Sequence, residues 1–219
     1  MQKFLNLLAC PRCKKASLVE GDDQLICTNC NAVFEISHGC PVFLKEKSHS
    51  SGFLGVMQRG FDTLEFLELT KKIGWRAAIK RTQVEGEPDK LNEINNEFRT
   101  SFLDLLDLNP HSTIVDIGSG TGGVVLQAAQ KGLHVISIDR SEVDASFVRE
   151  MVKQERLDRV TCVLADGINL PIQSNSVDAV AVVGVLEWAA ADYPNENPRE
   201  IQLEFLQEAR RVLKKKGKL

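Results

Sequence analysis

The second half of the chain alternates short apolar runs with amphipathic stretches. The apolar runs, each of strand length, cover residues 113–117, 134–139, 160–164 and 177–183. Helical spacing follows at residues 124–131, from Ser141 onward, and at 199–213. This alternation predicts an α/β fold, a Rossmann-like doubly wound parallel sheet with right-handed crossovers. Ligands of such sheets bind at the carboxyl ends of the strands.

The region before this sheet carries two helical patterns. Apolar side chains recur at three- and four-residue steps over residues 61–80, although Gly74 interrupts them. A second amphipathic helix is expected over residues 91–106, with an apolar face formed by Leu91, Ile94, Phe98, Phe102, Leu105 and Leu106. We expect this helix to pack on the sheet, with a lid over the ligand as the alternative. Residues 45–60, rich in Ser, Gly and charge, are expected to be a linker.

The N-terminal segment predicts a β-hairpin framed by two cysteine pairs. Strand-like residues at 17–19 and 24–26 flank a Gly-Asp-Asp turn. The framing cysteines are Cys10, Cys13, Cys27 and Cys30. Two Cys-x-x-Cys turns can present four thiolates to one Zn²⁺, which leaves no open position for catalysis and makes the metal structural. Two disulfides are the alternative, which a cytosolic setting disfavours.

Composition narrows the class of protein without fixing its partners. Of the 219 residues, 43% are hydrophobic and 26% are charged, as in a globular protein. No apolar run reaches the roughly 18 residues of a membrane span, and the N-terminus lacks the apolar core of a signal peptide, so we expect a cytoplasmic protein. The net charge of −3 does not favour nucleic-acid binding, although local Lys and Arg clusters leave it open.

A glycine-rich loop follows the first predicted strand of the sheet. Read literally, Gly118, Gly120 and Gly123 satisfy the dinucleotide fingerprint, which is weak evidence alone. Asp116, two residues before the first glycine, changes the interpretation. Its carboxylate would repel a diphosphate but would attract the ammonium group of a methionine moiety.

Two further acids follow the next two predicted strands. Asp139 closes the second strand, where its carboxylate can accept hydrogen bonds from both hydroxyls of a ribose. Asp166 follows the third strand, where an adenine amino group could donate to it. The three acids and the glycines thus suit an adenosyl ligand with a charged amino-acid tail.

This ordered set resembles the class I S-adenosylmethionine-dependent methyltransferase family. The matching stretches are Val115-Asp116-Ile117-Gly118-Ser119-Gly120-Thr121-Gly122, Ile138-Asp139, Ala165-Asp166-Gly167-x-x-Leu170-Pro171, Ser176-Val177-Asp178-Ala179-Val180 and Glu208-Ala209-Arg210-Arg211-Val212-Leu213-Lys214. The resemblance implies S-adenosyl-L-methionine as the cofactor. It also implies that the methionine end is held by Asp116, Gly118 and Gly120, the ribose by Asp139, and the adenine by Asp166 and Gly167, with Arg140 nearby.

The loop after the fourth predicted strand would face the methyl group and its acceptor. It runs Gly184-Val185-Leu186-Glu187-Trp188 and lacks the Asn-Pro-Pro-aromatic signature of family members that methylate adenine and glutamine nitrogens. That chemistry is therefore disfavoured. Glu187 is either a base or a cap of the following turn, and Trp188 is expected in the core or at the rim rather than under the acceptor. No catalytic residue is assigned.

The N-terminal segment resembles the small zinc-ribbon activators of tRNA, rRNA and release-factor methyltransferases, and the zinc modules of some bacterial rRNA guanine methyltransferases. The matching stretches are Leu8-Ala9-Cys10-Pro11-x-Cys13, Leu25-Ile26-Cys27-x-x-Cys30, Phe34-Glu35-Ile36 and Gly39-x-Pro41-Val42-Phe43-Leu44. Cys40 departs from the pattern, which usually has an aliphatic residue there. The resemblance implies a possible protein partner through the ribbon.

We divide the chain into a zinc-ribbon module at 1–44, a linker and helical lid or packing segment at 45–110, and a methyltransferase domain at 111–219. Class I methyltransferases usually have seven strands, whereas four are predicted here, and residues 214–219 are expected to be the turn into a fifth. We therefore expect a truncated domain whose fourth strand is an unpaired apolar edge.

The leading functional hypothesis is methyl transfer by direct displacement, which needs alignment of donor and acceptor more than a general base. RNA is one acceptor class, because of the ribbon. A small molecule or saccharide is the other, because Gly184-Val185-Leu186-Glu187-Trp188, the insert at 193–198 and Gln202-x-x-Phe205-Leu206 resemble methyltransferases found with cell-surface polysaccharide synthesis. The slightly acidic net charge also favours this class. The alternative function is a zinc-ribbon adaptor or binding module with an inactive methyltransferase-like domain, and a nicotinamide oxidoreductase is a remote third.

Overall fold

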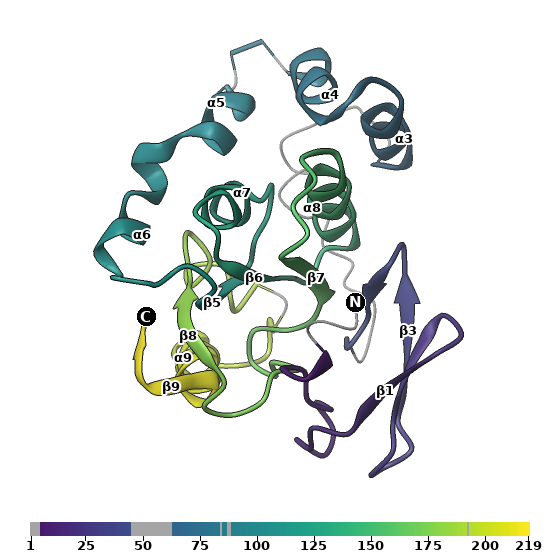
Figure 1. Cartoon of the computed structure of the whole chain (residues 1–219), viewed down its shortest axis with the longest axis vertical. Helices are drawn as coiled ribbons and strands as arrows, with labels where there is room; N and C mark the ends of the chain where they lie inside the picture. Colours follow the sequence, from purple (N-terminus) through teal and green to yellow (C-terminus); the bar gives the residue numbers. More distant parts are fainter. Residues whose placement is uncertain (1–4, 45–62, 84, 87–88, 192) are drawn as a thin grey trace.

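The computed structural model describes residues 5–44, 63–83, 85–86, 89–191 and 193–219. The expected linker at 45–60 lies outside the described residues, as do the first two residues of the helical pattern that begins at 61. Figure 1 shows a parallel sheet covered by helices, with a small antiparallel sheet beside it.

A five-stranded parallel sheet forms the centre of the larger part. Its strands are β5 (Thr113–Ile117), β6 (His134–Asp139), β7 (Val160–Leu164), β8 (Val177–Ala181) and β9 (Leu213–Lys218). They lie in the order β7-β6-β5-β8-β9, so the strand order reverses at β5. All five residues of β5 are buried, because β6 and β8 flank it and helices cover both faces. The predicted Rossmann-like fold is confirmed, and its switch point lies at the carboxyl end of β5.

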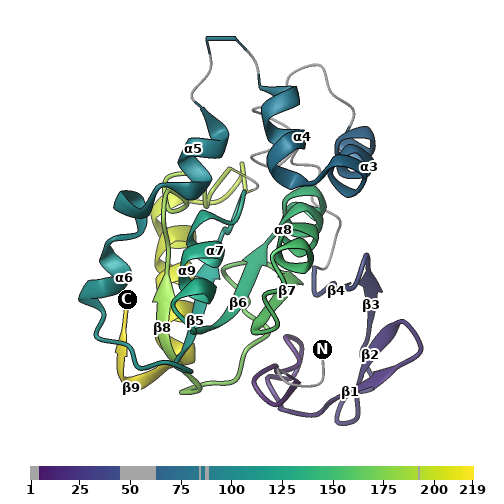
Figure 2. The ribbon, with the colours of Figure 1, turned by 45° about the horizontal axis from the view of Figure 1, so that its top comes forward.

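Two separate layers of helices cover the two faces of this sheet (Figure 2). On one face, α7 (Gly123–Gln130) and α8 (Glu142–Gln154) pack over a core that contains Ile114. On the other face, α9 (Pro198–Val212) packs over a core that contains Val115. Both cores are built from the same strands, because successive strand residues point to opposite faces.

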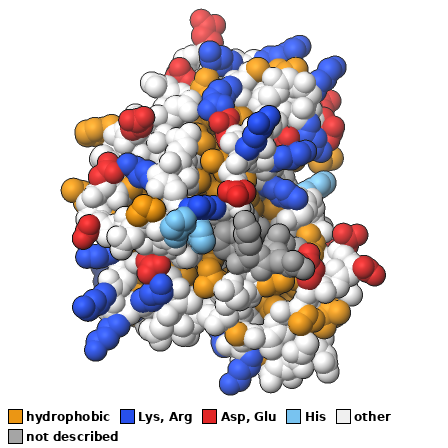
Figure 3. Space-filling view, in the orientation of Figure 1, with side chains coloured by type: hydrophobic (Ala, Val, Ile, Leu, Met, Phe, Trp, Pro, Cys, Tyr) orange, Lys and Arg blue, Asp and Glu red, His pale blue; other side chains and the backbone are white. Residues whose placement is uncertain are grey.

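The lysine-rich segment after α9 is an edge strand, which corrects the expectation of a turn at 214–219. β9 pairs in parallel with β8, with Leu213 opposite Val177 and Lys218 opposite Ala179. The apolar β8 is therefore an inner strand, and the expectation of an unpaired apolar edge was wrong. Lysines at 214–216 are exposed, and Figure 3 shows basic side chains gathered at the lower left, where β9 lies. Lysines suit an edge strand because they discourage pairing with another chain.

The N-terminal residues form a four-stranded antiparallel sheet in the order β1-β2-β3-β4. The strands are β1 (Leu18–Gly21), β2 (Gln24–Cys27), β3 (Val33–Ser37) and β4 (Cys40–Pro41). The first two form the predicted hairpin, with Gly21 opposite Gln24. This small sheet, with a cysteine pair on each of two turns, is consistent with the predicted zinc ribbon.

Backbone hydrogen bonds join this module to the β7 edge of the parallel sheet. A parallel bridge pairs Val42 with Leu164, and the N–H of Phe43 donates to the carbonyl of Leu164 at 2.8 Å. Leu8 forms an antiparallel bridge with Ile172. Buried side chains of the module also share the core beneath α9. The module and the larger sheet therefore pack as one body at this edge.

The first helical pattern forms two helices that pack on α8. Gly74, with a φ of 88°, separates α3 (Thr63–Ile73) from α4 (Trp75–Thr82). The rings of Phe66 and Phe147 stack with centroids 5.6 Å apart, which ties α3 to α8. None of the described helices is long and apolar enough to cross a membrane.

The second helical pattern is broken, which corrects the expectation of one helix over 91–106. It forms three short elements, α5 (Lys90–Asn95), the 3₁₀ helix η1 (Glu97–Thr100) and α6 (Phe102–Leu105). The side chain of Asn96 accepts a hydrogen bond from the N–H of Phe98 at 2.9 Å and so starts a new turn. Ile94 is buried, but Phe98 is 86% exposed and Leu105 is 84% exposed. Leu91, Phe102 and Leu106 also pack against the core, so the expected packing is confirmed for part of the face and wrong for Phe98 and Leu105.

Candidate cofactor site and metal centre

Backbone hydrogen bonds hold the loop between β5 and α7 against the end of β6. The N–H groups of Gly118 and Ser119 donate to the carbonyl of Ile138 at 2.8 and 3.0 Å. Gly118 has a φ of 73°, and a Cβ atom there would approach Val185 Cγ2 to 2.3 Å. Only glycine fits this position, because the backbone is left-handed and Val185 fills the space above it.

Asp116 is buried at the carboxyl half of β5, with 2% of its surface exposed. None of the described residues donates a hydrogen bond to its carboxyl group. Burial, and then repulsion from Asp139, raises the pKa of Asp116 to about 7. A buried acceptor without a donor is unfavourable unless a ligand supplies one. The site therefore suits a cationic donor such as an ammonium group.

Asp139, at the end of β6, fastens the glycine loop with both carboxylate oxygens. Oδ2 accepts from the N–H of Gly120 at 2.8 Å, and Oδ1 accepts from the N–H of Ser141 at 2.9 Å. Burial raises the pKa of Asp139, although these backbone hydrogen bonds oppose the shift. A carboxylate has about four acceptor positions, so it can also accept from ligand hydroxyl groups.

Asp166 follows β7 and is held in a polar group with Arg140 and Tyr193. Its Oδ1 accepts from the N–H of Ile168 at 3.2 Å, and its Oδ2 lies 3.5 Å from Arg140 Nη1. Tyr193 donates its hydroxyl to Oδ2, and the Arg140 guanidinium lies 5.2 Å from the centre of the Tyr193 ring. Arg140 and Asp166, two of the residues predicted to lie near the adenine, are thus in contact.

Tyr193 is the residue of this group that sequence reasoning missed. It is the single tyrosine of the sequence, in the insert after β8, and this rarity was the available signal. Gly167 has a separate reason to be glycine, since a Cβ atom there would come within 2.1 Å of Phe205 Cε2 on α9. The loop at 184–188 lies beside the glycine turn, because Val185 fills the space above Gly118. Trp188 is 70% exposed, which excludes the core as its position.

The four framing cysteines meet at one point. Their Sγ atoms all lie within 4.8 Å of one another, with Cys10–Cys30 and Cys13–Cys27 both at 3.6 Å. Four sulfurs at about 2.3 Å from a tetrahedral Zn²⁺ would be about 3.8 Å apart. All six cysteines are free thiols, and a disulfide would need about 2.05 Å between sulfurs. The donor set therefore fits a closed structural zinc site.

One of these thiols is already biased towards the thiolate that a metal requires. Burial alone would raise the pKa of Cys27. Hydrogen bonds from Ser17 and from the backbone of the second Cys-x-x-Cys turn outweigh burial and lower it to about 6. The Ser17 hydroxyl lies 3.2 Å from Cys27 Sγ. This environment favours deprotonation without any change of the fold.

Comparisons with known proteins find two family matches along the chain. Residues 115–219 match the family model described as a methyltransferase domain, and residues 2–39 match the one described as Trm112p-like protein. The part of the chain with the Rossmann-like fold is therefore similar to methyltransferase domains. The N-terminal part is similar to Trm112p-like proteins and has a four-cysteine cluster that is consistent with a zinc ribbon.

Individual relatives include enzymes with different acceptors. The glycine/sarcosine/dimethylglycine N-methyltransferase of Actinopolyspora halophila is 32% identical over 115 residues, 51% of this chain and 18% of that protein. The 18S rRNA (guanine(1575)-N(7))-methyltransferase of Saccharomyces cerevisiae is 29% identical over 135 residues, 59% of this chain and 46% of that protein. A SAM-dependent methyltransferase structure from Aquifex aeolicus has a TM-score of 0.46 at 21% identity, covering 70% of this chain and 68% of that chain. The chain spans less than half of both curated relatives.

Proposed function

We propose that the protein is an S-adenosyl-L-methionine-dependent methyltransferase. The observation that carries the proposal is the buried Asp116 carboxyl group, which has no described donor and lies directly before the glycine turn. An ammonium group would supply the missing hydrogen bond and neutralise the charge. A diphosphate at the same place would add repulsion to an already unfavourable carboxylate.

The remaining predicted residues suit the rest of the cofactor. Asp116, Gly118 and Gly120 would hold the methionine end, and Asp139 would accept from the ribose. Arg140, Asp166 and Gly167 would surround the adenine, with the Tyr193 ring as a further wall. When bound, S-adenosyl-L-methionine supplies an activated methyl group. The chain's own part is to orient that cofactor beside the acceptor, and no general base is assigned.

We further propose that Zn²⁺ is held by Cys10, Cys13, Cys27 and Cys30 and has a structural role. Four thiolates complete a tetrahedron and leave no position for substrate. Thiols kept for a metal favour a reducing compartment such as the cytoplasm. The zinc-ribbon module would extend over 1–44, the helical segment over 45–110 and the methyltransferase domain over 111–219.

The acceptor class stays open between a small molecule or saccharide and RNA. The names of the two curated relatives cover both classes, since one acts on glycine derivatives and the other on rRNA. The net charge of −3 favours the small molecule. A protein partner could bind the ribbon only on surfaces other than those already paired with Leu164 and Ile172. A gel-shift titration with salt would reveal RNA binding, because phosphate contacts weaken as salt rises.

Calorimetric titration of S-adenosylhomocysteine into the zinc-loaded chain tests the proposal. We expect saturable one-to-one binding that Asp116→Asn weakens and that Asp104→Asn, at an exposed acid, leaves unchanged. No binding by the wild-type chain would leave the alternative, an adaptor with an inactive domain. Tighter binding of a nicotinamide dinucleotide than of S-adenosylhomocysteine would overturn the choice of cofactor.

A further inference from the structure

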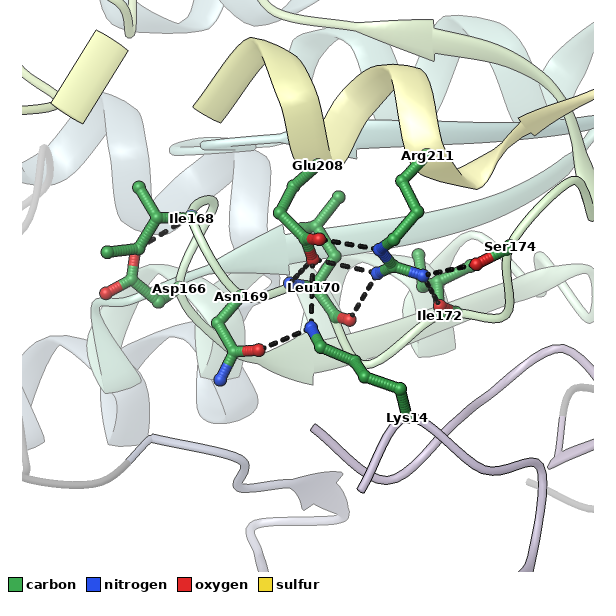
Figure 4. A network of polar contacts seen from close by, with 9 residues as sticks. All are labelled: Lys14, Asp166, Ile168, Asn169, Leu170, Ile172, Ser174, Glu208 and Arg211. Carbon is green, nitrogen blue, oxygen red and sulfur yellow. Dashed lines mark hydrogen bonds and ion pairs between the residues drawn. The ribbon is translucent and has the colours of Figure 1, made fainter. Parts of the chain in front are cut away.

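A polar network links the first cysteine turn to the larger domain (Figure 4). Lys14 directly follows Cys13, and its backbone N–H donates to the carbonyl of Cys10 at 2.7 Å. Its Nζ donates to Asn169 Oδ1 at 2.5 Å and pairs with Glu208 Oε2 at 3.2 Å. Lys14 has a left-handed backbone, with a φ of 58°. The turn that presents two thiols therefore also sets the direction of this side chain.

Two side chains of α9 bind the backbone of the loop that contains Asn169. Arg211 Nε donates to Glu208 Oε1 at 2.6 Å, and Glu208 Oε2 accepts from the N–H of Leu170 at 2.7 Å. The Arg211 guanidinium also donates to the carbonyl groups of Leu170 at 2.9 Å and Ile172 at 2.7 Å. Figure 4 shows these groups converging on the loop from α9. The loop thus has a fixed position on α9, with the lysine as its contact to the module.

The loop held in this way begins at Asp166. The N–H of Ile168 donates to Asp166 Oδ1 at 3.2 Å, and the N–H of Asn169 donates to the Asp166 carbonyl at 3.0 Å. Asn169 therefore contacts Lys14 through its side chain and Asp166 through its backbone. A path of hydrogen bonds thus leads from the cysteine turn through Asn169 to the backbone carbonyl of Asp166, and the N–H of Ile168 in the same loop holds the Asp166 carboxylate.

We propose that Lys14 is a positioning residue that couples the four-cysteine module to the adenine end of the cofactor site, by fixing Asn169 and through it Asp166. The proposal rests on the proposed function, because it assigns Asp166 to the adenine. It explains what a structural metal module contributes to a cofactor site that it does not touch. The metal holds the turn, the turn directs the lysine, and the lysine orients the loop.

A purely stabilising role suits Lys14 poorly. Its side chain is 41% exposed, and ion pairs at such exposure contribute little to folding. The module and the domain are already joined by backbone hydrogen bonds and a shared core. Loss of the lysine side chain is therefore expected to leave the fold intact and to relax the geometry of residues 166–170.

The test compares S-adenosylhomocysteine with its purine-riboside analogue, in which a hydrogen atom replaces the adenine amino group. S-adenosylhomocysteine can donate from that amino group to Asp166, whereas the analogue cannot. We expect the zinc-loaded wild-type chain to prefer the adenosyl ligand by about tenfold, as one hydrogen bond of about 1.4 kcal/mol gives. Lys14→Met should reduce this preference to about threefold by calorimetry. Asn169→Ala should do the same, and the double variant should lose no more.

Matched controls distinguish loss of this coupling from general destabilisation of the fold. Lys15→Met removes the adjacent exposed lysine and should keep the full preference. Lys14→Met should retain one zinc ion per chain by plasma emission. In a chelator competition, saturating S-adenosylhomocysteine should tighten zinc binding in the wild-type chain, because coupling between two sites is reciprocal. Lys14→Met should reduce that gain.

The outcomes distinguish the two proposals. If the wild-type chain binds neither ligand, the proposed function fails and the coupling fails with it. If it binds S-adenosylhomocysteine and Lys14→Met keeps the full preference, the function stands and the coupling is overturned. An equal loss of affinity for both ligands, or loss of zinc from Lys14→Met, would also overturn it, since either result indicates general support of the fold.

Discussion

Asp116 and Asp139 place a buried and a half-buried carboxyl group at the ends of adjacent parallel strands. Burial, and then the charge of Asp139, raises the pKa of Asp116 to about 7. Asp139 has backbone donors on both oxygens, whereas Asp116 has none among the described residues. Because of this difference, Asp116 is the acid whose carboxylate a bound cation would stabilise most.

Cofactor affinity should therefore depend on pH below neutrality. The carboxylate form of Asp116 attracts the ammonium group of the ligand. Affinity for S-adenosylhomocysteine should therefore rise from pH 5.5 to pH 7.5, as the Asp116 carboxyl group loses its proton. Asp116→Asn should bind about 10- to 100-fold more weakly at pH 7.5, because a charged hydrogen bond of about 1.5–3 kcal/mol is lost. Its affinity should be nearly flat over the same range. Calorimetry at three pH values checks this, and a steep pH profile in Asp116→Asn would contradict it.

The same shift predicts the pH dependence of folding without ligand. A carboxyl group whose pKa is raised in the folded state favours that state when the pH is below its unfolded-state pKa of about 3.9. This contribution to stability is lost as the pH rises through the folded-state pKa of about 7. Asp116→Asn carries no charge, so the ligand-free variant should melt at a higher temperature than wild type at pH 8. The difference should shrink at pH 5. Asp104→Asn, at an exposed acid, should show no such dependence of the melting temperature on pH. If Asp116→Asn melted at a lower temperature than wild type at pH 8, this explanation would be ruled out.

Gly167 should not tolerate a methyl group. A Cβ atom at this position would meet Phe205 Cε2 at 2.1 Å, and Phe205 is 4% exposed in the core beneath α9. Gly167→Ala should lower the free energy of unfolding by about 1–3 kcal/mol, as overpacking does. Gly21→Ala, where the nearest atom lies at 3.4 Å, is the control. Denaturant unfolding measures both, and adding Phe205→Leu should recover part of the loss if the clash is its cause.

Removal of one thiol should unfold the module. Cys13→Ser leaves three thiolates, and a segment of this size depends on metal for its folding, with about 10–16 kcal/mol of zinc binding in comparable peptides. We expect loss of zinc and loss of amide protection at Ala9, Phe43 and Gln173, whose N–H groups donate across the contact between the module and the larger part of the chain. Cys40→Ala, outside the cluster, should keep one zinc ion per chain. Stoichiometric zinc in Cys13→Ser would show that the four sulfurs are not one site.

The sequence predicted the parts of this fold that local pattern controls. Alternating runs gave the β5–β8 strands, and paired Cys-x-x-Cys turns gave the module. The β9 strand was missed because its lysines are polar like a turn, and only pairing with β8 reveals the strand. The break at Asn96 was missed because the apolar spacing continues through it. The contact of Lys14 with Asn169 joins residues 155 positions apart, and no sequence pattern encodes that distance.

Tyr193 offers a test of the adenine side that separates its two contacts. Its hydroxyl donates to Asp166, and its ring lies beside the Arg140 guanidinium. Tyr193→Phe keeps the ring and removes the donor, so affinity for S-adenosylhomocysteine should fall about threefold, in the range of one modest hydrogen bond. Tyr193→Ala also removes the ring and should cost about tenfold or more, because a cation–π contact is lost as well. Trp188→Ala, at an exposed residue of the preceding loop, should bind like wild type. Equal affinity in all three variants would place the adenine elsewhere, since both side chains that Tyr193 contacts are assigned to that end of the cofactor.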